Sequence, residues 1–276
     1  MRPGLAACLF WLVLLAGCVQ SAFYQPDRVL YDTPARHGIK FEQVVFPSKD
    51  GTRLVGWFIP ASGHGDPRRA RGTVVHFHGN AQNMSAHWRY VDWLVQRGFN
   101  LFVFDYRGYG ASEGSPDSKG VFEDSVAALD YVRSRPDVDV ARLLVFGQSL
   151  GGTNAIAAVG SGNRAGVRAV AIEATFFSYS SIASEKLVGA GSLADDTYSA
   201  ERFISALSPL PLLLMHGTAD GVVPYSHSER LFAKAVEPKR LVRIEGGAHT
   251  EALTPRFGAV YQDLLTAFFA AALAAD

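Results

Sequence analysis

Cysteine is nearly absent from this 276-residue chain, which has only Cys8 and Cys18, both close to the N-terminus. The chain after residue 18 therefore has no thiol for a disulfide framework, a thiolate nucleophile or a zinc cluster. Concentrated positive charge is missing too, because 26 basic residues balance 26 acidic ones and no basic run exceeds Arg68-Arg69. Nucleic-acid binding needs a strongly positive face, so we expect no nucleic-acid partner.

Charge of either sign is missing between Arg2 and Asp27, where residues 5–16 form an apolar run. The run is short for a membrane span, but it has the length of an export signal. An ordinary cleaved signal and an uncleaved membrane anchor are both compatible with it.

The end of this run, Leu15-Ala16-Gly17-Cys18, resembles a bacterial lipobox. The resemblance implies that residues 1–17 are a signal peptide and that diacylglycerol is attached to the Cys18 thiol. It also implies a lipid-anchored protein of the bacterial cell envelope. Val19 favours the periplasmic face of the outer membrane if the source is Gram-negative. Residues 18–38 would then tether the lipid to the globular part.

Hydrophobic residues make up 48% of the chain and charged residues 19%, which is typical of a globular protein. We see no internal repeat, and we expect one monomeric domain over residues 39–276. Short apolar runs predict strands at residues 41–46, 54–59, 74–78, 101–106, 143–147, 170–174, 212–216 and 241–244. Helical spacing predicts helices at residues 84–97, 121–133, 150–159, 228–236 and 257–272. This alternation predicts an α/β fold with a mainly parallel eight-stranded sheet and helices on both faces.

Two segments depart from the alternation. Asp50-Gly51 lies between the first two strands and predicts a hairpin, so these strands should be antiparallel at one edge of the sheet. Residues 176–209 are longer than one crossover helix requires, and they predict a small cap between strands six and seven. A single helix followed by a long loop is the alternative.

The sequence Gly147-Gln148-Ser149-Leu150-Gly151 has the pattern G-x-S-x-G, directly after a strand and directly before a helix. A sharp turn at this place exposes the serine hydroxyl, and the two glycines leave room for the backbone to pass. We therefore expect Ser149 to be a nucleophile.

A serine hydroxyl needs a base, and the base needs an acid that fixes its tautomer. His249 follows the last expected strand and Asp220 follows the strand before it. We expect both to meet Ser149 at the carboxyl edge of the sheet. Glu173 ends another strand and is a rival acid, whereas Asp105 lies one strand too early and is expected to be structural.

The turn after the third strand should help to stabilise a developing oxyanion. We expect the backbone N–H groups of Asn80 and Leu150 to form this oxyanion hole, because Leu150 begins a helix. His76 and His78 have the H-x-H spacing of a strand metal site, but no further ligand follows at close range. We therefore expect no metal and no cofactor.

Four motifs in this order carry a family resemblance: residues 77–81, 105–114, 147–152 and 216–224. They resemble the Bem46-like α/β-hydrolases, which are grouped with the serine aminopeptidase-like hydrolases and include esterases and acyl-thioesterases. Extending over residues 24–269, the resemblance implies the α/β-hydrolase fold and a triad of Ser149, Asp220 and His249. It also implies that Asp105 and Arg107 are scaffold residues.

These features predict a serine hydrolase that cleaves small acyl esters or thioesters through an acyl-enzyme. Apolar residues of the expected cap (Phe176, Phe177, Leu187 and Leu193) and the lipid anchor favour acyl or lipid-like substrates. A serine peptidase would use the same triad but would need a carboxylate for an amine terminus, for which Asp195-Asp196 is the candidate. A non-catalytic envelope protein that keeps the scaffold is a third alternative. Haloalkane dehalogenases and epoxide hydrolases are disfavoured, since they need Asp in place of Ser149.

Overall fold

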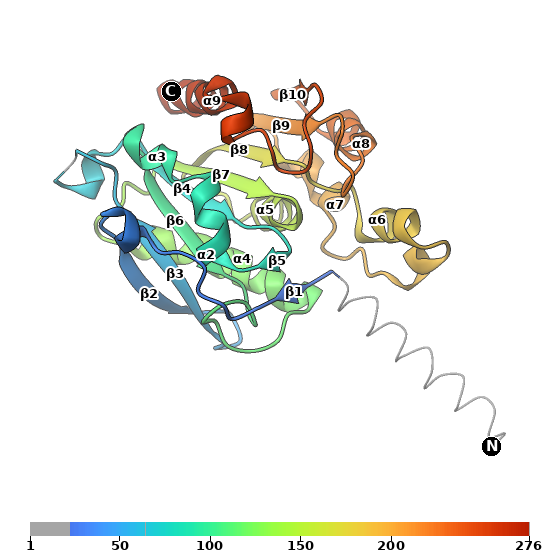
Figure 1. The fold of residues 1–276 in the computed structure, drawn as a ribbon, viewed down its shortest axis with the longest axis horizontal. Coiled ribbons are helices and arrows are strands. Elements are labelled where there is room, and N and C mark those ends of the chain that lie inside the picture. The colour runs from blue at the N-terminus through green and yellow to red at the C-terminus, as the bar shows by residue number, and fades with distance from the viewer. Residues whose placement is uncertain (1–22, 64, 276) are drawn as a thin grey trace, which may run out of the picture.

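The computed structural model describes residues 23–63 and 65–275, so the expected signal peptide and Cys18 lie outside the described residues. An eight-stranded sheet runs through the molecule (Figure 1), with the spatial order β10-β9-β8-β7-β4-β6-β3-β2. Its strands are β2 (Glu42–Pro47), β3 (Arg53–Ile59), β4 (Thr73–Phe77), β6 (Asn100–Asp105), β7 (Leu143–Gln148), β8 (Val167–Glu173), β9 (Leu212–Gly217) and β10 (Lys239–Ile244). All neighbouring strands are parallel except the pairs β2–β3 and β3–β6. The predicted mainly parallel sheet with an antiparallel edge is confirmed.

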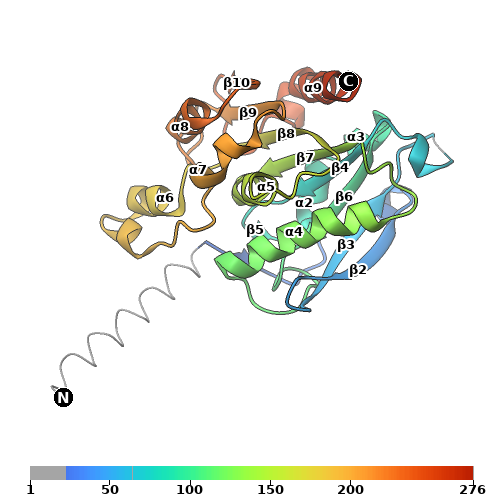
Figure 2. The same cartoon turned by 180° about the vertical axis from the view of Figure 1, so that it is seen from behind.

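Helices cover both faces of the sheet, as Figures 1 and 2 show from opposite sides. One face packs against α4 (Ser118–Ser134), α5 (Leu150–Gly160) and α8 (Ser226–Lys234), and the other packs against α2 (Met84–His87), α3 (Trp93–Gln96) and α9 (Val260–Ala274). Successive residues of a strand point to opposite faces. On β7, Val145 therefore packs in the first core, whereas Leu144 and Phe146 pack in the second. Within the described part of the chain, no helix has the length and apolar character needed to cross a bilayer.

The single helix predicted over residues 84–97 is wrong. The structure has α2, then a 3₁₀ turn η3 (Trp88–Tyr90), then α3. The N–H of Val91 donates to the carbonyl of Trp88, and the N–H of Leu94 donates to that of Val91. All three side chains are buried. A spacing of three residues puts side chains on one face of a 3₁₀ turn as well as on one face of an α-helix, so the apolar pattern could not distinguish the two.

The segment between β8 and β9 contains four short helices: α6 (Tyr179–Lys186), η4 (Ala190–Leu193), α7 (Ala200–Phe203) and η5 (Ile204–Leu207). We call residues 176–209 the cap segment. A capping box of Ser178 and Ser181 starts α6, and Asp196 accepts hydrogen bonds from the Ser180 N–H and the Ser199 hydroxyl. Helix α6 projects from the body on the side toward which the parallel strands point (Figure 1).

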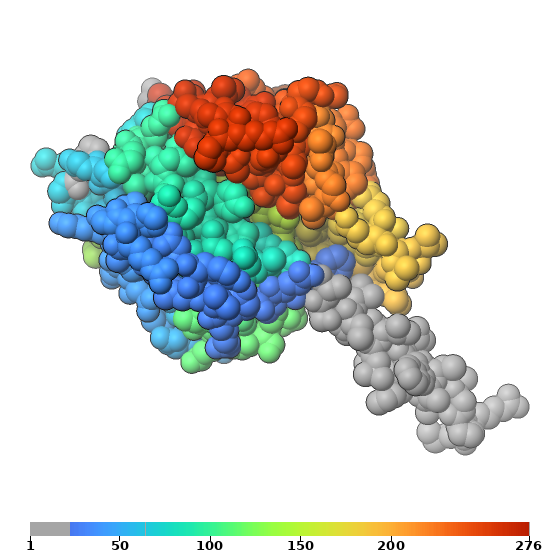
Figure 3. All heavy atoms as spheres, in the orientation of Figure 1, coloured from blue at the N-terminus to red at the C-terminus, as the bar shows by residue number. Residues whose placement is uncertain are grey.

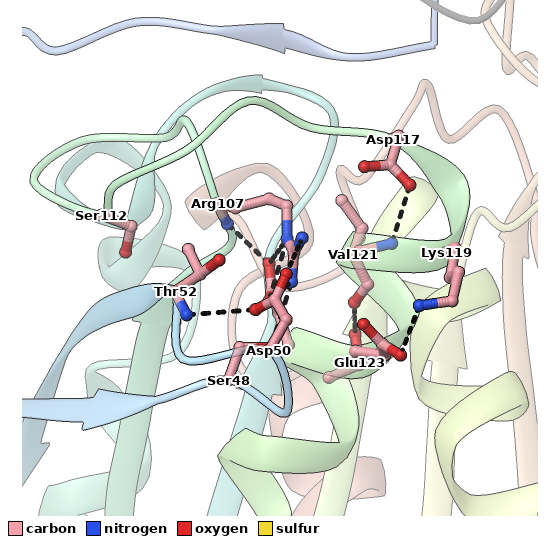
Figure 4. Close-up of polar contacts among 12 residues, drawn as sticks. Ser48, Asp50, Thr52, Arg107, Ser112, Asp117, Lys119, Val121 and Glu123 are labelled. Atoms are coloured by element: carbon pink, nitrogen blue, oxygen red, sulfur yellow. Dashed lines mark hydrogen bonds and ion pairs between the residues drawn. The ribbon is translucent and has the colours of Figure 1, made fainter.

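A buried ion pair fixes the loop that follows β6 (Figure 4). The Arg107 guanidinium donates to the Asp124 carboxylate at 2.8 Å and to Asp50 at 2.9 Å, and the Arg107 backbone N–H donates to Asp124 at 2.7 Å. The Arg107 side chain is 8% exposed and that of Asp124 is 0% exposed. Arg107 therefore joins the β2–β3 hairpin turn to α4, and this is a scaffold position.

We expect Asp124→Ala to lower the free energy of unfolding by about 3–5 kcal/mol, because it leaves a buried guanidinium without its main partner. Asp130→Ala is the matched control on the same helix, since Asp130 pairs with Arg133 and its side chain is 62% exposed. Its loss should be about 0–1 kcal/mol. Urea unfolding of the parent and both variants measures the difference, and equal losses would contradict this account of Arg107.

Candidate active site

Ser149 lies in a sharp turn between the end of β7 and the start of α5, with φ 54° and ψ −123°. Few residues other than glycine adopt a positive φ. The neighbouring glycines allow the turn to pack closely. A Cβ on Gly151 would lie 2.1 Å from the Phe77 carbonyl oxygen, and one on Gly147 would lie 2.6 Å from the Gly152 Cα. The G-x-S-x-G spacing is therefore required by contact of this turn with the end of β4 and with α5 itself.

Loops at the carboxyl ends of three strands bring the three predicted residues together. The Nε2 atom of His249 lies 3.0 Å from the Ser149 Oγ, and its Nδ1 atom lies 2.8 Å from the Asp220 Oδ2. An ionised carboxylate can only accept hydrogen bonds, so Nδ1 carries the proton and Nε2 accepts from the serine hydroxyl. A histidine that removes the proton of a serine during attack has this arrangement.

The Asp220 side chain is fully buried, and its surroundings stabilise the carboxylate. The backbone N–H groups of Val222 and Val223 donate to Oδ1 at 2.8 and 2.9 Å. Burial alone would raise the pKa of Asp220, but hydrogen bonds from His216 and His249 hold that pKa well below its usual range. His216 Nε2 lies 3.2 Å from Oδ2. Sequence reasoning gave no separate role to His216, although it is a buried polar residue in an apolar strand.

The rival acid, Glu173, has other partners. Its Oε2 accepts from the Gln148 side-chain amide at 2.7 Å, and its Oε1 accepts from the Ala252 backbone N–H at 2.9 Å. The Gln148 Oε1 in turn accepts from His76 Nε2 at 3.0 Å. This buried chain of groups connects β4, β7 and β8 to the loop that carries His249. The acid that contacts the imidazole of His249 is Asp220, while Glu173 supports the loop.

The two predicted oxyanion donors lie beside the nucleophile. Asn80 and Leu150 both line the pocket that contains Ser149. A Cβ on Gly79 would lie only 3.7 Å from the Ser149 Cβ, so the turn after β4 approaches the serine closely. Leu150 is the first residue of α5, where backbone N–H groups have no partner within the helix. Both N–H groups are thus candidates for binding a negative oxygen at Ser149.

The first described residues form part of this site. Gln25–Pro26 form strand β1, which pairs in parallel with β5 (Ala81–Gln82). The Gln25 backbone N–H donates to the Asn80 Oδ1 at 2.8 Å, and Tyr24 is buried, with its hydroxyl 3.2 Å from that of Tyr179. The sequence predicted a tether here and not a strand, because a two-residue strand has no periodicity to detect.

A cavity of about 730 Å³ opens beside Ser149 and His249. The cap segment supplies much of its apolar wall, and the first described residues and the loop of Asp220 supply further lining. The apolar lining residues include Phe23, Leu150, Phe176, Ile182, Ala183, Leu187, Val222 and Val223. Among the described residues that line it, none is acidic and Lys186 is the only lysine or arginine. Its size is typical of a small-molecule site.

The histidines of the H-x-H pattern have protein partners. His76 bonds to Gln148, while His78 Nδ1 donates to the Gly79 carbonyl and its Nε2 lies 3.4 Å from Asp105. Asp105 also accepts from the Met84 backbone N–H at 2.7 Å, which is a structural role. In residues 23–63 and 65–275, no three His, Cys, Asp or Glu side chains gather as metal ligands would.

Comparison with known sequences finds the family described as "Serine aminopeptidase, S33" over residues 68–193. YfhR of Escherichia coli K12 is 47% identical, covering 96% of this chain and 94% of its own length. The α/β-hydrolase domain-containing protein WAV2 of Arabidopsis thaliana is 36% identical, covering 74% and 69%. Bem46 of Schizosaccharomyces pombe is 29% identical, covering 80% and 74%.

Comparison with solved structures finds the same fold. The Pyrococcus furiosus esterase Pf2001 aligns with a TM-score of 0.72 over 89% of this chain and 97% of its own, at 19% identity. The α/β-hydrolase GrgF of a Penicillium species aligns with a TM-score of 0.69 over 86% and 100%, at 20% identity. At these identities the likeness concerns the arrangement of the chain and not the reaction.

We expect His76 to make the fold sensitive to acid. Burial lowers the pKa of His76 to about 3, compared with about 6.5 in an unfolded chain. Its neutral form therefore contributes stability that is fully present above pH 6.5 and is lost as the pH falls toward 3. Between pH 7 and pH 5 this histidine should account for about 2 kcal/mol of the lost unfolding free energy.

Urea unfolding at pH 7 and pH 5 measures this effect in the parent and in His76→Gln, whose amide does not titrate. The loss between the two pH values should be smaller in the variant by about that amount. The same loss in both proteins would show that His76 binds no extra proton on unfolding.

Proposed function

Since the chain belongs to the α/β-hydrolase family that includes WAV2 and Bem46, we propose that it hydrolyses ester or thioester bonds through an acyl-enzyme on Ser149. The observation that carries this proposal is the continuous set of hydrogen bonds from Ser149 through His249 to Asp220. A serine without a base is a poor nucleophile, and these contacts supply the base and the acid that orients it.

In the first step, the Ser149 Oγ attacks the acyl carbonyl carbon while its proton passes to His249 Nε2. The carbonyl electron pair moves onto oxygen, and the backbone N–H groups of Asn80 and Leu150 are the proposed donors to that oxyanion. When the intermediate collapses, the bond to the alcohol or thiol breaks, and the leaving group takes the proton from His249. The acyl group stays on Ser149.

In the second step, a water molecule gives a proton to His249 and attacks the acyl-enzyme. Collapse of the new intermediate releases a carboxylic acid and returns the proton to the Ser149 Oγ. Asp220 remains ionised through both steps, consistent with its lowered pKa, and it stabilises the imidazolium form of His249.

The pocket favours acyl substrates over peptides with a free amine terminus. An amine terminus needs a negative partner, and the described lining of the pocket has no acidic side chain. The candidate carboxylates, Asp195 and Asp196, bond within the cap segment to Thr197, Ser180 and Ser199. Lys186 on the pocket wall would repel an amine.

We also propose, from the lipobox-like residues 15–18, that residues 1–17 are removed and that the mature chain is anchored in a bacterial envelope through Cys18. Mass spectrometry of the membrane-extracted protein tests this directly, because diacylglycerol on Cys18 adds a defined mass. An unmodified N-terminus would contradict it.

Ser149→Ala should lower turnover of p-nitrophenyl butyrate by at least about 10³-fold, because only binding and the oxyanion donors remain. Ser161→Ala, at the other end of α5, is the matched control and should keep parental turnover. A fluorophosphonate probe should label the parent and the control but not Ser149→Ala. Equal turnover by all three proteins would refute the assignment of Ser149, and an unlabelled parent would favour the non-catalytic alternative.

Substitution of Asp220 and substitution of Glu173 should have different effects on turnover. Asp220→Asn should lower kcat by about 10⁴-fold, because the amide favours the wrong tautomer of His249. Glu173→Gln should retain most of the turnover, since Glu173 bonds to Gln148 and Ala252. Circular dichroism checks that both variants fold. A large loss in Glu173→Gln together with an active Asp220→Asn would reverse the assignment.

A further inference from the structure

We infer that the mouth of the pocket docks on a lipid bilayer and that acyl ester substrates enter it directly from the membrane. The inference rests on the proposed ester hydrolysis and names its substrate class as esters of bilayer-resident lipids. Three features carry it: where the described chain begins, what lies at the rim of the pocket, and how the pocket lining continues onto the surface.

The described chain begins in the wall of the pocket. Phe23 and Gln25 line the cavity, and the Phe23 ring lies 5.0 Å from that of Tyr179 at the start of α6. Figure 3 shows the blue start of the described chain beside the projecting yellow surface of α6 and η4. A membrane anchor in the residues before Phe23 would therefore be connected to the protein at the wall of the pocket.

The proposed anchor is close in sequence to that wall. Cys18 precedes Phe23 by five residues, and an extended chain spans at most about 3.6 Å per residue, which gives about 18 Å. A lipid on Cys18 would place the bilayer surface within this distance of the pocket. If residues 5–16 instead stay in the membrane as an uncleaved anchor, their last residue precedes Phe23 by seven residues, and the bilayer lies within about 25 Å. Both forms of the anchor bring the membrane to the same side of the protein.

The rim on that side is apolar and exposed. Leu187 is 69% exposed and Val188 is 96% exposed, at the tip between α6 and η4. Val222, on the loop of Asp220, is 49% exposed. Leu187 and Val222 also line the pocket, so the apolar lining continues onto the surface. An apolar rim around a pocket mouth marks an interaction site.

The chemistry of this tip fits a bilayer surface. Lys186 is exposed beside the apolar tip, and surfaces that lie in the membrane interface combine apolar side chains with lysines whose amines reach the head groups. Docking would let an acyl chain pass from one apolar environment into another. Because transfer of each methylene into water is unfavourable, entry through water would weaken binding of long chains.

The test uses the full chain reconstituted into phosphatidylcholine vesicles that contain a dilute fluorogenic long-chain acyl ester, with p-nitrophenyl butyrate as the soluble substrate. Val188→Asp adds a charge at the tip without changing a residue that lines the pocket. Val236→Asp is the control, because Val236 is 51% exposed. It lies just before β10, at the amino ends of the parallel strands, whereas Ser149 lies at their carboxyl ends. Both variants change the net charge equally.

We expect Val188→Asp to lower turnover of the vesicle ester by about tenfold or more, with soluble-ester turnover unchanged and with Val236→Asp like the parent for both substrates. Unchanged vesicle turnover, or an equal loss on both substrates, would overturn the inference while leaving the proposed hydrolysis intact. The inference is also overturned if Val188→Asp only converts a dimer into monomers, because the tip would then be a contact between copies. A parent that hydrolyses neither ester and takes no fluorophosphonate label would remove the proposed function itself.

Discussion

The strained turn at Ser149 is the constraint on which the site depends. A residue other than glycine keeps a positive φ only where its surroundings determine it. Here the end of β8 and the residues after it bind both the N–H and the carbonyl of Ser149. The Ser149 N–H donates to the Glu173 carbonyl at 2.9 Å, and the Thr175 hydroxyl donates to the Ser149 carbonyl at 2.9 Å. Gly152 allows this contact, since a Cβ there would lie 1.7 Å from the Thr175 Oγ1. Relaxation of the turn would move the hydroxyl away from His249.

The imidazole of His249 is located by constraints that converge from two directions. On one side, Asp220 is itself held by His216 and by the backbone of its own loop. On the other side, Glu173 holds the Ala252 N–H three residues after His249. Burying such polar groups is unfavourable unless each finds a partner. The buried polar chain therefore couples the register of three parallel strands to the position of a loop, which apolar packing alone does not specify.

The sequence predicted those parts of the site that depend on topology. Parallel strands end at one edge of a sheet, so the residues that follow β7, β9 and β10 lie at the same edge, whatever their distance along the chain. It did not predict contacts that depend on side-chain packing in three dimensions. The support of His249 by Glu173 belongs to this class, as does the pairing of Gln25 with Ala81. The broken helix over residues 84–97 was missed because a spacing of three does not separate two kinds of helix.

The site has two parts: the loops that follow strands of the central sheet, and the pocket lining that comes from outside the sheet. The turn at Ser149 and the loops that carry Asp220, His249 and Asn80 follow strands of the central sheet, and a solved structure at 19% identity shares the overall fold. A shared scaffold cannot by itself select a substrate. Further lining comes from Phe23, from Gln25 and from the cap segment, none of which belongs to the central sheet. The Gln25 N–H donates directly to the Asn80 Oδ1, so Gln25 also supports the loop proposed to bind the oxyanion. Phe23 and Gln25 therefore join the pocket lining to the loop after β4, at the first residues that the structure describes.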